Sequence, residues 1–187
     1  NMTLVDKITA SVKDATPADV AQLSRLASSI PFLSQGMPFM QAGQEFLRSK
    51  GGDPNSYKSS DAVNSLKWST QSTHTVTVKY FKGLIALRKA HPAFRMTSTE
   101  LVRKNLKFLT SPEGTIAYSL NGAAVKDSAG TLVVIHNANT TAQTISLPKT
   151  GTWSVHVEGD RAGTSVLRKI NGDSVVVAPR STLVITQ

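Results

Sequence analysis

The chain has 187 residues, of which 40% are hydrophobic and 18% are charged, so its composition is that of one or two globular domains and excludes a disordered or fibrous protein. It contains no cysteine, which excludes disulfides, thiolate metal sites and cysteine nucleophiles within these residues. Its net charge of +9 forms no basic cluster, and no apolar run approaches the roughly 18 residues of a membrane span, which argues against a nucleic-acid or membrane partner.

The first predicted element is a helix that follows Thr16. Thr16 is a suitable N-cap, Pro17 suits the first helical position, and Asp19 is favourable at the positive end of the helix dipole. The apolar residues that recur at helical spacing predict its buried face: Val20, Leu23, Leu26 and Ile30. We expect Pro31 to bend or end this helix.

Residues 37–41 form a short apolar run without helical period and predict a buried strand that ends in polar residues. The following residues 48–57 contain paired glycines, an Asp-Pro step and an Asn, which together predict a long loop. A single strand between two helices has no partner within the chain, and its backbone donors and acceptors would be unsatisfied if it were buried. We therefore expect further polypeptide to supply the neighbouring strands.

The second half of the chain changes its hydrophobic period. A helix is predicted from Thr73 until Pro92, but after about residue 98 apolar residues alternate with polar ones, so only strands and turns are expected there. Turn dipeptides occur at intervals that suit an antiparallel β-sandwich: Asn121-Gly122, Ala129-Gly130, Glu158-Gly159 and Asn171-Gly172. The predicted boundary between the two parts is near residue 98.

Four segments of the sequence carry a family resemblance. Residues 36–46, in which a Gly-x-Pro opening runs into Gly-x-Glu, resemble the last barrel strand of the α-amylase superfamily. Residues 47–57 resemble the corresponding loop of type I pullulanases, with Lys-Gly-Gly-Asp followed by Asn-Ser-Tyr. Residues 1–4 are similar to the segment directly after the His-Asp pair of barrel strand seven, and residues 178–184 resemble the final strand of the C-terminal sandwich. The chain thus resembles the C-terminal portion of a type I pullulanase, in glycoside hydrolase family 13.

The resemblance implies a fold that is α/β plus all-β. Residues 1–98 would be the last part of a (β/α)8 TIM barrel, namely its helix 7, strand 8 and helix 8, and residues 99–187 a C-terminal antiparallel β-sandwich. It also implies a retaining debranching hydrolase that acts on α-1,6-glucosidic bonds in pullulan, starch or limit dextrins. The catalytic carboxylates would then lie upstream, so we assign no catalytic residue and expect the chain alone to be inactive.

The same resemblance defines the expected partners and cofactors. The expected partners are an α-glucan substrate and the upstream barrel portion of the same protein. No cofactor is expected in this chain, and calcium, which is common in the superfamily, is expected only on the parent enzyme. The four histidines show no metal-ligand spacing, so no metal site is predicted.

The loop supplies the candidate site residues. By the resemblance, Asp53 matches a family Asp that accepts hydrogen bonds from sugar hydroxyls, and its alternative role is to shape the Asp-Pro turn. Asn55 would reach the same sugars or form an Asx-turn, and Tyr57, where many α-amylases carry Arg, would stack on a glucose ring. Glu45 is expected to bind backbone amides of the loop rather than substrate.

Other interpretations stay open at this stage. The parent enzyme could be another glycosidase of the superfamily: an isoamylase, a neopullulanase or an α-amylase. The chain could instead be a non-catalytic carbohydrate-binding module or an interaction domain, which the even charge distribution neither supports nor excludes. Trp153 lies on a period-two strand and is expected in the sandwich core, whereas Trp68, next to the loop, suits a core position and a sugar platform equally.

Overall fold

The computed structural model describes residues 2–187, so Asn1, which takes part in the resemblance at the N-terminus, lies outside the described residues. Its α-helices are α1 (Leu4–Ser11), α2 (Pro17–Leu33), α3 (Asp61–Asn64), α4 (Thr75–Ala90) and α5 (Thr99–Asn105). Its short 3-10 helices are η1 (Gln44–Phe46), η2 (Ser56–Lys58), η3 (Trp68–Gln71), η4 (Pro92–Arg95) and η5 (Ala123–Val125). Within residues 2–187 no helix has the length and apolar character needed to cross a membrane.

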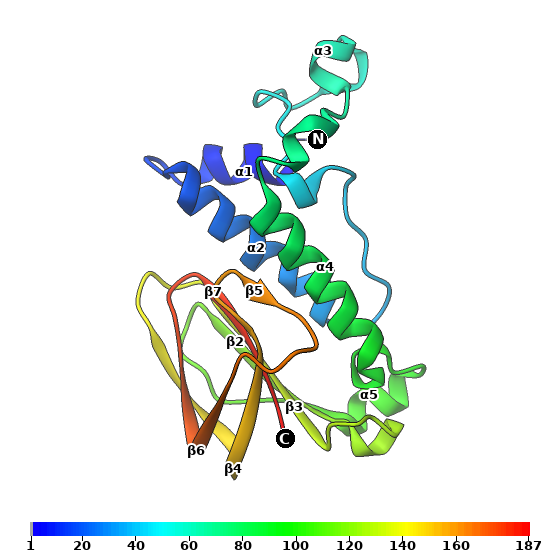
Figure 1. The fold of residues 1–187 in the computed structure, drawn as a ribbon, viewed down its shortest axis with the longest axis vertical. Helices are drawn as coiled ribbons and strands as arrows, with labels where there is room; N and C mark the ends of the chain where they lie inside the picture. Colours follow the sequence, from blue (N-terminus) through cyan, green and yellow to red (C-terminus); the bar gives the residue numbers. More distant parts are fainter. Residues whose placement is uncertain (1) are drawn as a thin grey trace.

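The strands form one antiparallel sheet below the helices (Figure 1). They are β1 (Leu106–Phe108), β2 (Thr115–Asn121), β3 (Thr131–Asn137), β4 (Gln143–Glu158), β5 (Arg161–Ala162), β6 (Arg168–Val177) and β7 (Ser181–Thr186). Their order is β1-β2-β3-β7-β4-β5, and β6 pairs with β4. The antiparallel strands that the alternating pattern predicts are therefore confirmed from residue 106 onward.

A bulge in β4 changes the face of the sheet toward which the following residues of this strand point. Val155 pairs with Ile185 and Val157 pairs with Val184, so two residues of β4 advance for one residue of β7, and His156 is the extra residue. As a result Val155 packs in the cluster that the strands enclose, whereas Val157 packs in the cluster below the helices.

The two hydrophobic clusters share strands β3 and β7. One cluster fills the space where β4 and β6 fold over β2, β3 and β7, and it contains the fully buried Trp153. The other lies between the helices and the opposite face of the sheet, where Tyr80 and Leu84 of α4 join Leu132 and Val184. Every residue of β7 is buried because both of its faces are covered. The helical part and the sheet therefore pack around a common core.

Helix α2 begins as the sequence predicts but ends later. The hydroxyl of Thr16 accepts from the amide of Asp19 at 3.2 Å, and the Asp19 carboxylate accepts from the amide of Thr16 at 3.0 Å, which completes a capping box. Pro31 lies inside the last turn, and the helix continues to Leu33. Pro31 therefore does not end the helix, and that part of the expectation is wrong. At this end of the helix Arg88 from α4 donates to the carbonyls of Phe32 and of the C-cap Ser34, and the hydroxyl of Tyr118 donates to that of Leu33.

Arg88 is a buried cation at the C-terminus of α2. Its guanidinium donates to the carbonyl oxygens of Phe32 at 2.9 Å and Ser34 at 2.7 Å, and also to that of Gly36. The partial negative charge of the helix end takes the place of a carboxylate partner. Burial lowers the pKa of Arg88.

The buried face of α2 differs from the predicted apolar stripe, because, of its four residues, only Leu26 is buried and the expectation for Ile30 is wrong. Ile30 is partly exposed, whereas Ser24, Ser28 and Ser29 are fully buried. The helix packs against α4 as well as against β3 and β7, and small serine side chains allow this close approach on two sides.

Two further predictions of secondary structure are wrong. Residues 99–105 form helix α5, where only strands and turns were expected, because the hydroxyl of Ser98 caps it by accepting from the amide of Leu101 at 3.1 Å. Residues 37–41 form no strand, and Met37 and Phe39 are 94% and 91% exposed. No strand pairs with this segment among the described residues, so it cannot form a hydrogen-bonded ladder.

A polar cluster joins α2 to the sheet. The hydroxyl of Ser29 lies 2.5 Å from that of Thr182 and 3.2 Å from His136 Nδ1, and Thr182 lies 2.9 Å from the same nitrogen. His136 is buried, and this burial lowers its pKa from 6.5 to about 4. The histidine is therefore neutral in the folded protein at neutral pH.

The folded protein should lose stability in acid because of His136. Between pH 6.5 and about 4 the unfolded state binds a proton at this histidine that the folded state does not, so the stability present above pH 6.5 falls as the pH falls. The loss should be about 3 kcal/mol over this window. Urea unfolding at a series of pH values measures it, and His136→Gln should show a shallower decline. An equal decline in the variant would contradict the assignment.

Candidate functional site

The predicted site begins where residues 37–41 turn into the loop at Gly43. Gly43 has φ +90°, and a Cβ there would lie 2.9 Å from the Cβ of Arg48, so both conformation and space require glycine. Glu45 Oε2 accepts a hydrogen bond from the amide of Gly43 at 3.1 Å. Glu45 therefore contacts a backbone amide at the start of the segment that leads into the loop.

Asp53 is engaged within the loop through both carboxylate oxygens. Oδ2 accepts from the hydroxyl of Ser59 at 2.5 Å, and Oδ1 accepts from the amide of Asn55 at 2.8 Å. The Ser59 hydroxyl and then the Asn55 amide hold the pKa of Asp53 below its usual value, so the side chain is ionised at neutral pH. This is the turn-shaping geometry, and each oxygen keeps a further lone pair for a ligand hydroxyl.

The other two candidates face solvent. Tyr57 is exposed, and the Lys58 ammonium lies 5.4 Å from the centroid of its ring. Asn55 is also exposed. Tyr57 and residues 39–42 line the same open hollow. Its lining consists of Met2, Phe39, Met40, Gln41, Ala42, Lys50, Ser56, Tyr57 and Asn64. The structure thus brings Tyr57, but not Asp53 or Asn55, to the end of the expected strand.

Asp6 of α1 anchors the loop, and sequence reasoning did not identify it. The hydroxyl of Ser49 donates to Oδ1 at 2.5 Å, while the amide of Lys50 and the hydroxyl of Thr3 each donate to Oδ2 at 2.8 Å. Burial by itself would raise the pKa of Asp6, but these hydrogen bonds outweigh it, and the pKa lies below its ordinary value. The available signal was the Thr3-x-x-Asp6 spacing of a helix cap, since the Thr3 hydroxyl also accepts from the amide of Asp6.

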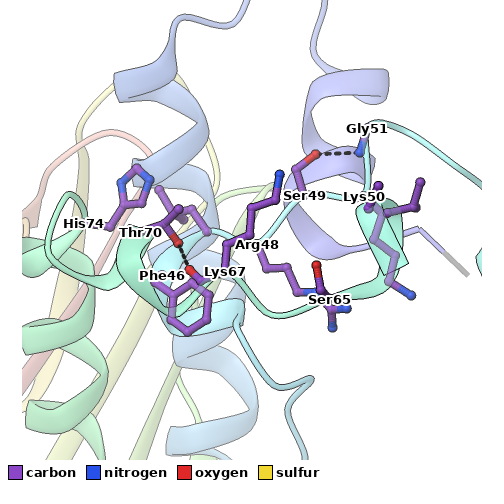
Figure 2. Close-up of a pocket in the computed structure, with 12 residues that line it drawn as sticks. Phe46, Arg48, Ser49, Lys50, Gly51, Ser65, Lys67, Thr70 and His74 are labelled. Carbon is purple, nitrogen blue, oxygen red and sulfur yellow. Dashed lines mark hydrogen bonds between the residues drawn. The ribbon is translucent and has the colours of Figure 1, made fainter. Parts of the chain in front are cut away.

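A hollow of about 430 Å³ lies between the loop and residues 62–74, and Figure 2 shows its lining. Its charged residues are all basic, namely Arg48, Lys50 and Lys67, and His74 also lines it. Arg48 donates to the carbonyl oxygens of Ala42 and Asn64, and Lys50 donates to the hydroxyl of Ser56 at 2.7 Å. Arg48 thus fastens the loop to residues on either side of it and Lys50 ties two positions within the loop together, so we assign the hollow to loop architecture.

His91 has a structural contact with a buried carboxylate. His91 Nδ1 lies 2.7 Å from the carboxylate of Asp127, which also accepts from the amides of Ala93 and Ala129. Burial by itself would raise the pKa of Asp127, but the two amides and His91 lower it overall. Over residues 2–187 no group of three or more His, Cys, Asp or Glu side chains is arranged to hold a metal ion.

The chain is similar in sequence to starch-debranching enzymes. Residues 102–161 match the family model described as the all-beta domain of pullulanase. The pullulanase of Bacillus subtilis strain 168 is 40% identical over 139 residues, which cover 74% of this chain and 19% of that protein. An isoamylase of Flavobacterium sp is 30% identical over 156 residues, which cover 72% of this chain and 20% of that protein. The chain thus spans about a fifth of the length of these relatives.

Solved structures of pullulanases are similar to this chain over its whole length. The pullulanase from Bacillus acidopullulyticus superposes with a TM-score of 0.95 at 43% identity and covers 100% of this chain and 23% of its own. A pullulanase from Paenibacillus barengoltzii, in complex with maltohexaose and α-cyclodextrin, has a TM-score of 0.90 at 41% identity, with 100% of this chain and 28% of its own covered.

Proposed function

We propose that this chain, which is homologous to the C-terminal regions of pullulanases and isoamylases, forms part of a debranching glycoside hydrolase. The enzyme would hydrolyse α-1,6-glucosidic bonds of pullulan, starch or limit dextrins by a retaining mechanism. The observation that carries this proposal is the similarity to pullulanase structures along the whole chain, including the loop of the candidate site.

The helical part is proposed to complete a (β/α)8 barrel. Helix α2, the extended residues 37–41 and helix α4 follow one another in the order helix 7, strand 8 and helix 8, so residues 1–98 would end the barrel and residues 99–187 would form the sandwich. The exposed Met37 and Phe39 support this arrangement, because neighbouring strands and helices of the barrel would bury them.

The chain would contribute substrate contacts and not the bond-breaking acids. Asp53 would accept hydrogen bonds from glucose hydroxyls with the lone pairs that the loop leaves free, Asn55 would bond the same sugars, and Tyr57 would stack on a glucose ring. Asp6 would hold the loop in place from α1. A retaining pair of carboxylates would come from the remainder of the enzyme.

A substitution of Asp53 tests the substrate contact. In the full-length enzyme, Asp53→Ala should raise the KM for pullulan about tenfold, because the loss of a charged acceptor weakens hydrogen bonds to sugar. Release of reducing sugar from pullulan is the measurement. If wild-type enzyme releases no sugar from either pullulan or amylopectin, the proposed function is wrong.

Ser59→Ala is the matched control for this variant. It removes the hydroxyl that bonds Asp53 Oδ2 but leaves the carboxylate in the loop. If Asp53 contacts sugar, Ser59→Ala should keep a KM close to that of the wild type. An unchanged KM in Asp53→Ala, or a rise in Ser59→Ala as large as that in Asp53→Ala, would contradict the assigned contact.

A further inference from the structure

Trp68 at the start of η3 is a large exposed aromatic side chain on a firm support. It is 60% exposed, whereas Trp153, the other tryptophan of the chain, is fully buried. Its ring centroid lies 5.5 Å from that of Phe46, which is buried, and the two rings are tilted by 57°. Phe46 therefore holds the indole in place while much of its surface stays open to solvent.

A groove runs from Trp68 along the start of α4. We call it the Trp68 groove, and it is lined by Trp68, Ser69, Gln71, Ser72, Thr75, Val78, Lys79 and Lys82. These side chains supply hydroxyl, amide and ammonium groups but no carboxylate. Both lysines are exposed and solvated. The groove thus combines one aromatic platform with hydroxyl, amide and ammonium groups that can bond to a ligand.

We propose that the Trp68 groove binds a segment of α-glucan, with a glucose ring stacked on the indole and its hydroxyls bonded by Gln71, Ser69 and Thr75. A glucose ring has an apolar face and a rim of hydroxyls, which matches a flat aromatic surface beside amide and hydroxyl groups. This inference rests on the proposed function. The groove is separate from the hollow at Tyr57, because the two share no lining residue.

The Trp68 groove lies near the loop of the candidate site, so a glucan bound there could also reach that loop. Both η3 and the loop lie beyond the N-terminal end of α4, at the end of the molecule that carries α3 (Figure 1). A glucan chain held on Trp68 would be kept close to that loop, which raises its effective concentration there. The groove would therefore help the enzyme to retain long-chain polymers.

Oxidative footprinting of the full-length enzyme tests the proposal. N-bromosuccinimide oxidises exposed tryptophan, and mass spectrometry of peptides reads Trp68 separately, with Trp153 as a buried internal reference. Maltoheptaose should protect Trp68, whereas inorganic phosphate should not. Gln71→Ala, which leaves the Phe46 contact intact, should raise the maltoheptaose concentration for half protection by about threefold. Phe108→Ala, which removes a 74% exposed aromatic from β1, should leave it unchanged.

The outcomes separate this site from the proposed function. An unreactive Trp68, no protection by maltoheptaose, or equal protection by phosphate would overturn the glucan groove. The proposal would also be overturned if Gln71→Ala needed the same maltoheptaose concentration as the wild type for half protection of Trp68. Protection of Trp68 in an enzyme that releases no sugar from pullulan or amylopectin would support the groove and contradict the proposed hydrolase.

Discussion

Gly83→Ala is expected to destabilise the protein by about 3 kcal/mol, although alanine is the better helix former. Gly83 lies in the middle of α4, where it faces the β5 hairpin. A Cβ at this position would lie 2.0 Å from the carbonyl oxygen and 2.4 Å from the carbonyl carbon of Ala162. Backbone atoms cannot rotate away as a side chain can, so α4 and β5 would have to separate and expose part of their shared core.

Gly163→Ala is the matched control for this substitution. It follows Ala162 directly, and a Cβ there would have no atom within 4 Å. Urea unfolding of both variants compares their free energies of unfolding with that of the wild type. We expect little change in Gly163→Ala. The close approach of Gly83 to the Ala162 backbone would be contradicted if Gly83→Ala were as stable as the wild type. It would also be contradicted if the variant were more stable by the usual helix preference of about 1 kcal/mol.

Arg88→Ala should lower the free energy of unfolding by about 3–4 kcal/mol. It removes three charge-assisted hydrogen bonds and leaves the carbonyls of Phe32, Ser34 and Gly36 without their donor at a buried helix end. Urea unfolding measures the effect. Arg88→Lys should recover only part of the loss, because an ammonium cannot span three carbonyls as the planar guanidinium does.

Lys89→Ala controls for the loss of a positive charge at the next position. Lys89 is exposed, so its removal should change the free energy of unfolding by less than about 0.5 kcal/mol. Similar effects of Arg88→Ala and Lys89→Ala would mean that Arg88 acts only through long-range charge. Full recovery in Arg88→Lys would argue against the geometry of the three hydrogen bonds.

Local features were well predicted from the sequence. The N-cap at Thr16 was predicted, and the structure extends it to a capping box with Asp19, three positions away, because such short-range hydrogen bonds depend mainly on neighbouring side chains. The alternating pattern and the turn dipeptides likewise predicted the antiparallel second half. The helix α5 was missed because its cap, Ser98, precedes a segment too short to show a helical period.

The candidate site was predicted only in part. The loop and the backbone contact of Glu45 could be expected from residues that are close in sequence. The anchoring of the loop by Asp6 could not, because Ser49 is separated from Asp6 by 43 positions and only the packing of α1 brings them together. The exposure of Trp68 was also undecided, since its sequence neighbours suit both a buried and an exposed ring.

By itself the sequence determined which of the longer segments are helical, which are β, and that residues 37–41 lack a partner within the chain. The tertiary structure alone decided which groups satisfy the carbonyls at the end of α2, because Arg88 comes from another helix and Tyr118 from the sheet. It alone decided that Trp68 stays exposed beside the buried Phe46. The physical reason is that backbone propensity depends on near neighbours in sequence, whereas burial and long-range hydrogen bonds depend on which faces meet once the elements have packed.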